Sequence, residues 1–251
     1  MFINNFSFCR IMQTVNSDRF IADLINSLIE KTQIPNIVIV GPSTLDRDHS
    51  LAYFTDLFSN TRSHLYVVDM PDNLPKVSYG SLATVKRQFG NLRRKHPHLV
   101  RPEFVGCDAY DLEHKLGESF ADILYDHNSL YHIALDKSRQ MSPDEAFNEI
   151  IKVYAHALKP SGKMILMDEA TDFGWPLWQD VLPALDKDGL QYKNYFINQD
   201  IDMSHKFPEL TKMRGHRTGI KKARNGIHYE CKTMIVAEKP PNRNYTSFFM
   251  N

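Results

Sequence analysis

The chain has 251 residues, 42% of them hydrophobic and 11% aromatic, which is enough to bury a full core and excludes a disordered protein. Its 30 Lys and Arg residues balance 30 Asp and Glu residues, so net charge favours neither nucleic acid nor an acidic partner. The three cysteines are scattered, and no apolar run approaches the roughly 18 residues of a membrane helix. We therefore expect a cytoplasmic protein without a membrane partner.

The beginning and end of the chain are expected to flank one large domain. Ser17 is suited to cap a helix, because apolar residues recur at helical spacing from Phe20 onward. We assign residues 1–34 to an N-terminal helical cap, residues 35–239 to the main domain and residues 240–251 to a C-terminal tail.

The stretch from Asn36 to Asp69 predicts the start of a parallel sheet. A short apolar strand precedes Gly41, an amphipathic helical run covers residues 50–59, and a second strand covers residues 64–68. Two parallel strands need such a crossover, which is almost always right-handed. Since ligands of these sheets bind beyond the carboxyl ends of the strands, Gly41 and Asp69 mark the expected site.

The alternation of strands and helices continues to the end of the domain. Ser142 is expected to begin a helix, because Pro143 and Glu145 complete a strong start pattern. Further strands are expected at 103–105, 121–125, 164–167, 190–197 and 231–238, and helices at 82–94, 143–158 and 173–185. The fold class is α/β, a doubly wound and mostly parallel seven-stranded sheet with a terminal antiparallel strand.

Two segments are interpreted as insertions with basic character. The first covers residues 70–101 and contains a helix with a basic end; the second covers residues 198–229 and is basic in its second half. Runs of like charge are most often solvated faces, and a phosphate-bearing substrate is the alternative interpretation.

Several short motifs occur in a characteristic order. Asp69 ends the second strand, the sequence Gly106-Cys107-Asp108-Ala109 follows the third, and Leu158-Lys159-Pro160-Ser161-Gly162 precedes the fifth. From about Asn36 to Glu238 the chain thereby resembles the class I methyltransferases, which use S-adenosylmethionine and have a Rossmann-like fold. The turn before the fifth strand is the most specific match, since it is similar to the family's Leu-Lys-Pro-Gly-Gly sequence.

The resemblance implies S-adenosylmethionine as the cofactor. Asp69 would hold the ribose hydroxyls, and Asp108 would lie toward the adenine amine. The implied cofactor-binding residues are Gly41, Ser43, Asp69, Met70, Asp108, Ala109 and Asp126. The first turn departs from the family pattern, because Ile39 stands at its acidic position and Ser43 at its second glycine.

Methyl transfer requires alignment of the acceptor with the methyl group and, for some acceptors, removal of a proton. Asp126, His127 and His132 follow the fourth strand and are the candidate catalytic residues. Asp168 and Glu169 end the fifth strand beside Asp126, and three such oxygen ligands could hold Mg²⁺.

We therefore expect an S-adenosylmethionine-dependent methyltransferase that acts on a small molecule or a protein side chain. The altered first turn keeps open a catalytically inactive binding or scaffold protein of the same fold. A nucleic-acid methyltransferase is the third alternative; the neutral net charge and the absence of an Asn-Pro-Pro-Tyr-like motif near Asp126 argue against it.

Overall fold

The computed structural model describes residues 34–42, 58–59, 62–71, 81–127, 129–137, 140–169, 177–198 and 231–241. The predicted helix after Ser17, most of the predicted crossover helix at 50–59 and nearly all of the 198–229 segment lie outside the described residues. The predicted domain limits stay predictions.

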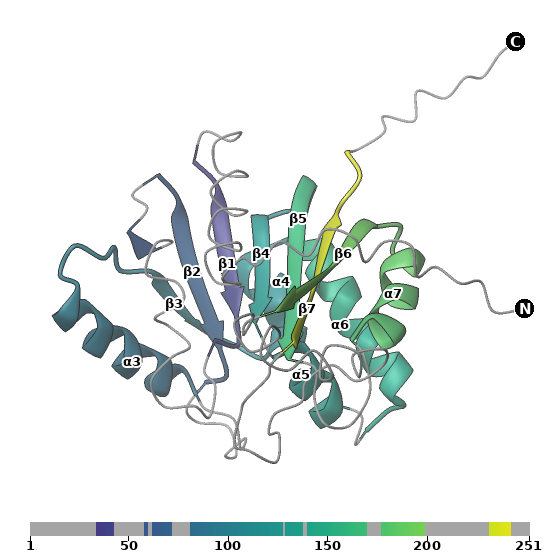
Figure 1. Cartoon of the computed structure of the whole chain (residues 1–251), viewed down its shortest axis with the longest axis horizontal. Helices are drawn as coiled ribbons and strands as arrows, with labels where there is room; N and C mark the ends of the chain where they lie inside the picture. Colours follow the sequence, from purple (N-terminus) through teal and green to yellow (C-terminus); the bar gives the residue numbers. More distant parts are fainter. Residues whose placement is uncertain are drawn as a thin grey trace, which may run out of the picture.

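Seven strands form one sheet (Figure 1). They are β1 (Asn36–Val40), β2 (His64–Asp69), β3 (Glu103–Gly106), β4 (Ala121–His127), β5 (Leu158–Glu169), β6 (Gln191–Asn198) and β7 (Cys231–Glu238). Their spatial order is β3-β2-β1-β4-β5-β7-β6, in which β7 runs antiparallel to both β5 and β6 while the remaining pairs are parallel. The expected mostly parallel sheet with terminal antiparallel pairing is confirmed.

Helices cover both faces of this sheet, which explains why its central strands are apolar throughout. The helices are α3 (Leu82–Lys95), α4 (Leu112–Leu116), α5 (Leu130–Lys137), α6 (Pro143–Ala157) and α7 (Leu177–Lys187), and a 3₁₀ turn, η3 (Ala109–Asp111), precedes α4. Ile37 and Ile39 pack toward Val85 and Phe89 of α3. Val38 belongs to the opposite cluster, which contains the buried residues of α6 and α7.

The hydrogen bonds between Ser142 and Glu145 confirm the predicted start of α6. The Glu145 N–H donates to Ser142 Oγ at 3.3 Å, and the Ser142 N–H donates to Glu145 Oε2 at 2.9 Å. This reciprocal capping satisfies donors that the first turn of a helix would otherwise leave unpaired. Local sequence therefore fixes where α6 begins, and with it the buried face that α6 presents to the sheet.

The start of β5 differs from the prediction of a turn followed by a strand at residue 164. The strand begins at Leu158, which pairs with Ala121, and the register then shifts before Lys163 pairs with Ile123. Ser161 has a φ of +63°, so the predicted turn exists as an irregularity within the strand.

Among the described residues, no helix is both long and apolar enough to cross a membrane.

Candidate functional site

The strand order reverses between β1 and β4, and in sheets of this kind ligands bind at the carboxyl ends of the strands around that point. Gly41 follows β1, and its N–H donates to the Val68 carbonyl oxygen of β2 at 2.9 Å. The Cys107 N–H, after β3, donates to the Asp69 carbonyl oxygen at 3.2 Å. The fold thus places Gly41, Asp69 and the residues after Gly106 at neighbouring strand ends, as the sequence predicted.

Asp69 is 7% exposed at this edge. Its Oδ1 accepts a hydrogen bond from the N–H of Met70 at 2.8 Å, which fixes the carboxylate at the strand end. Asp108 is fixed in a similar way, because its Oδ1 accepts from the Tyr110 N–H at 3.0 Å and caps η3. Ala109 follows within η3 and is buried. Two carboxylates on adjoining strand ends therefore have orientations set by the backbone.

Gly41 is required by close packing as well as by backbone conformation. Its φ is +57°, and a β-carbon at this position would lie 2.4 Å from Ser129 Cβ, far inside van der Waals contact. Ser129 reaches this turn from the loop between β4 and α5. Ser43, the second residue expected to contact the cofactor from this turn, lies outside the described residues.

Asp126 is fully buried and is held by four hydrogen bonds from the protein itself. Its Oδ1 accepts from Ser129 Oγ at 2.6 Å, from the Ser129 N–H at 3.1 Å and from the Leu130 N–H at 3.0 Å. Its Oδ2 accepts from the Tyr154 hydroxyl at 2.7 Å. Ser129 Oγ also lies 3.2 Å from the Val40 carbonyl oxygen, so the network reaches the turn at Gly41.

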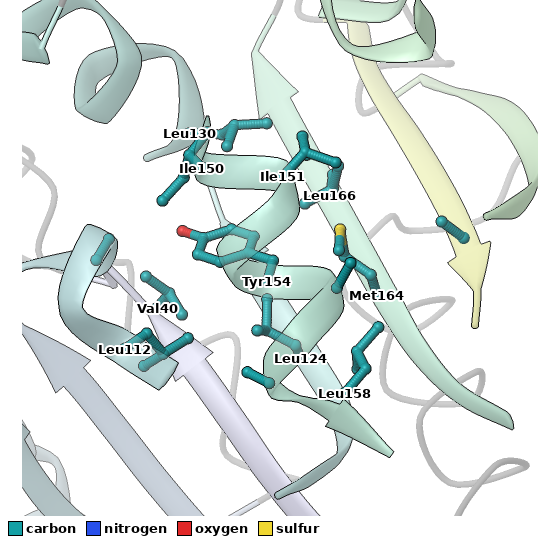
Figure 2. Packing of buried hydrophobic residues seen from close by; sticks show 14 of the residues in the cluster. Val40, Leu112, Leu124, Leu130, Ile150, Ile151, Tyr154, Leu158, Met164 and Leu166 are labelled. Carbon is teal, nitrogen blue, oxygen red and sulfur yellow. The ribbon is translucent and has the colours of Figure 1, made fainter. Parts of the chain in front are cut away.

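Figure 2 shows Tyr154 projecting from α6 into the core, with its hydroxyl among aliphatic side chains. Burial raises the pKa of Asp126, and the hydrogen bonds from Ser129, Tyr154 and Leu130 act in the opposite direction. Burial and the neighbouring Asp126 both raise the pKa of Tyr154, so its hydroxyl keeps the hydrogen that it donates. These contacts favour a structural role for Asp126 over the predicted catalytic, cofactor-binding and metal-binding roles.

Sequence reasoning missed Ser129 and Tyr154. Ser129 stands just before α5, three residues after Asp126, which is a spacing at which an acidic side chain can bond the start of a helix. That pattern could have been recognised. Tyr154 occupies an apolar position of α6, where helical periodicity predicts only that the ring is buried, so the partner of its hydroxyl could not have been predicted.

Known structures with this architecture include methyltransferases. A methyltransferase from Methanosarcina mazei, described as S-adenosylmethionine-dependent, is 13% identical, covers 87% of this chain and 97% of its own, and has a TM-score of 0.52. The CurJ carbon methyltransferase is 12% identical, covers 89% of this chain and 54% of its own, and has a TM-score of 0.53. The fold is that of the class I methyltransferases.

The same fold also carries another chemistry. The 4+2 cyclase SpnF is 15% identical to this chain, covers 90% of it and 81% of its own length, and has a TM-score of 0.51. No family model and no curated protein sequence matches this chain. A methyltransferase fold at such identities establishes architecture and leaves the reaction to be argued from the site.

The described residues fit the nucleoside half of the methyltransferase cofactor better than its amino-acid half. Asp69 and Asp108 supply oxygen acceptors at adjoining strand ends. Ile39, at the position that is acidic in the resembled family, is fully buried within β1 and offers no acceptor for an ammonium group.

The other predicted catalytic and metal residues lie at or near the same sheet edge of the methyltransferase fold. His127 ends β4 and pairs with Met167, while Asp168 and Glu169 end β5. His132 lies in α5. The side chains of these four predicted residues are outside the described part of the structure. Within the part that is described, no three potential metal ligands come together, so the Mg²⁺ prediction has no support here.

Proposed function

We propose that the protein binds S-adenosylmethionine at the carboxyl edge of β1, β2 and β3 and transfers its methyl group to a small molecule or a protein side chain. The observation that carries this proposal is the position of Asp69. Asp69 ends β2, is almost fully buried and directly follows Val68, whose carbonyl oxygen accepts the N–H of Gly41. A carboxylate has acceptor positions for both hydroxyls of a vicinal diol such as a ribose.

The roles of the residues follow from what each can offer. Asp69 would orient the ribose, Asp108 and Ala109 would border the adenine, and Met70 and Gly41 would contribute backbone next to them. When bound, the cofactor supplies an electrophilic methyl group on a sulfonium. The leaving group is a neutral thioether, so no acid is needed to protonate it. The protein's task is therefore alignment of the acceptor and, where the acceptor is protonated, removal of a proton. His127 and His132 are the proposed bases, because Asp126 is occupied by its own hydrogen bonds.

A second candidate function is ligand binding without methyl transfer. Ile39 favours it, because a buried isoleucine cannot supply the acidic contact of the resembled family. This alternative keeps the nucleoside contacts of Asp69 and Asp108. It predicts binding of S-adenosylhomocysteine at least as tight as that of S-adenosylmethionine, with no product formed.

Replacement of Asp69 by Asn tests the shared basis of both functions. The change keeps the shape of the side chain and removes the charge, so charge-assisted bonds to the ribose hydroxyls weaken. We expect S-adenosylhomocysteine to bind about 10- to 100-fold more weakly, the range for hydrogen bonds to charged groups. Titration calorimetry with the unmodified and variant proteins measures this directly.

Asp186→Asn is the matched control, because Asp186 lies exposed on α7 and should leave the affinity unchanged. Equal affinity of the Asp69→Asn variant would remove the ribose contact from the proposal. Failure of the unmodified protein to bind either S-adenosylmethionine or S-adenosylhomocysteine would reject both functions. Binding without methylation across an acceptor screen would favour the second.

A further inference from the structure

One side of α3 carries a concentration of positive charge. Lys86, Arg87, Arg93 and Arg94 are exposed on α3, and Arg101 is exposed just before β3. We call these five residues the basic face. No Asp or Glu occurs in the sequence between Asp72 and Glu103, so no acidic residue of this segment offsets them. Since the whole chain is neutral, the rest of it carries a net negative charge.

Helical spacing orders the four α3 cations of the basic face into two parallel rows. Lys86 and Arg93 are seven residues apart, as are Arg87 and Arg94, and seven residues are close to two helical turns. Each pair therefore repeats on one side of α3, with about 10 Å between its members. The rows flank and oppose the apolar side formed by Leu82, Val85 and Phe89, which is buried against the sheet.

The aromatic ring of Phe104 adjoins this surface. The Lys86 Nζ atom and the Arg101 guanidinium each lie 6.0 Å from the centre of that ring. The ring is itself packed edge-on against Phe89, with 5.7 Å between ring centres, so it forms a fixed platform for both cations. Among the described residues, none of the five cations forms an ion pair. Arg94 donates to Asn91 Oδ1, a neutral acceptor, at 2.9 Å.

We propose that the basic face binds the sugar-phosphate backbone of a nucleic acid. Rows of exposed guanidinium and ammonium groups match a polymer that carries a phosphate at every nucleotide. An anionic membrane or a protein partner fits less well, because both are normally held through exposed apolar or aromatic anchors. Apart from its cations, the exposed residues of α3 are Ala83, Gly90 and Asn91, which provide no such anchor.

The neutral charge of the whole chain does not oppose this surface. At an ionic strength of 0.15 M, charges interact over only about 8 Å, so a phosphate near α3 senses the local cations. Acidic residues gather elsewhere, as at Asp144 and Glu145 in the first turn of α6, on the far side of the sheet from α3 (Figure 1). The proposal concerns binding alone, and its test does not depend on whether the protein transfers a methyl group.

The position of α3 also relates this surface to the candidate cofactor site. The Leu82 N–H donates to the Met70 carbonyl oxygen at 2.9 Å, so α3 begins directly beside Asp69 and Met70. The helix has 14 residues and extends about 21 Å from there. A nucleic acid lying on the basic face would thus be held within one helix length of that site.

The test measures binding of fluorescently labelled 20-nucleotide single-stranded RNA and DNA by anisotropy, without cofactor, from 50 to 300 mM salt. Five phosphate contacts on a single strand predict a slope of log affinity against log salt of about −3.5. We expect Arg87→Gln/Arg94→Gln to make this slope shallower by about 1.4 and to weaken binding at the lowest salt by about tenfold or more. Both residues are exposed, and thermal melting checks that the fold is intact.

Lys152→Gln/Lys187→Gln is the matched control, because it removes the same charge from exposed positions of α6 and α7. An unchanged affinity of the control supports the assignment to α3. Equal losses in the two double variants, or an undiminished affinity of the α3 variant, would overturn it. So would the absence of binding at 50 mM salt, or preferential binding to vesicles that contain anionic lipid.

Discussion

Asp126 shows how a single buried carboxylate can organise the surroundings of a candidate site. It lies on β4 and accepts a hydrogen bond from the Tyr154 hydroxyl of α6. It also accepts hydrogen bonds from the N–H groups at the start of α5. An unpaired carboxylate in this position would be costly, and each of its four donors offsets part of that cost. The residue therefore fixes the loop that follows β4, directly after the proposed base His127 at the end of that strand.

Tyr154→Phe should destabilise the protein by about 2 kcal/mol, because it removes a hydrogen bond to a buried charged group and adds no volume. Tyr192→Phe is the matched control. Its hydroxyl bonds Asp186 at 3.4 Å in an exposed position, so the loss should be below about 0.5 kcal/mol. Urea denaturation followed by circular dichroism measures both. Equal destabilisation of the two variants would contradict the assigned role of Tyr154.

The raised pKa of Asp126 predicts a pH dependence of stability with a definite sign. Above the pKa of the unfolded carboxyl, about 3.9, the folded state retains the proton longer than the unfolded state does. The stability that the Asp126 carboxyl contributes is therefore lost as the pH rises from about 3.9 through the pKa of Asp126 in the folded protein. At higher pH this stability stays lost.

Asp126→Asn removes this titration. The free energy of unfolding of the unmodified protein, minus that of the variant, should fall as pH increases from about 4 and then level off. Urea denaturation at closely spaced pH values between 4 and 8 gives the difference, in which contributions from other carboxylates cancel. A difference that rises with pH would mean that the hydrogen bonds outweigh burial and lower the pKa of Asp126.

At the scale of elements, the turn after β1 and the loop before α5 depend on each other. Gly41 and Ser129 come from segments far apart in sequence, yet a single added β-carbon cannot fit between them. The Ser129 hydroxyl donates to Asp126 of β4 and lies 3.2 Å from the Val40 carbonyl oxygen of β1, and the strand order reverses between these two strands. The edge proposed for the cofactor is therefore held by packing between β1, β4 and α5.

Gly41→Ala should cost more than about 3 kcal/mol of stability, because it combines left-handed strain with an overlap in the core. Gly189→Ala isolates the first contribution, since Gly189 has a φ of +67° and a β-carbon added there would meet no other atom within 4 Å. We expect that control to lose about 1 to 2 kcal/mol. Denaturation curves measure the loss of stability in both variants. Similar losses would show that Ser129 can move away from the added β-carbon at little cost in free energy.

At the scale of the whole molecule, the fold separates charges that cancel in the sequence. The helix α3, with its rows of cations, covers one face of the sheet, whereas α6 and α7 cover the other (Figure 1). The candidate cofactor residues lie at the strand ends between these layers. One neutral chain can thus combine a site for a small nucleoside with a surface for a polyanion.

Much of this architecture is encoded locally. The apolar runs of β1 and β2, the capping pattern at Ser142 and the periodicity of α3 predicted those elements close to their observed limits, because each depends on neighbours in sequence. The expected edge of Gly41, Asp69 and Asp108 follows from parallel topology, in which all carboxyl ends meet at one side.

The roles of the polar residues near that edge depend on contacts between distant parts of the chain. Local sequence is sufficient to predict that Asp126 ends a strand and that residues 82–101 are basic, but it does not specify which atoms surround them. Burial beside Tyr154 and Ser129 makes Asp126 an internal anchor, because long-range packing selects the partners of a carboxylate. Packing of Val85 and Phe89 on the sheet turns the cations of α3 outward, which converts a basic stretch into a basic face.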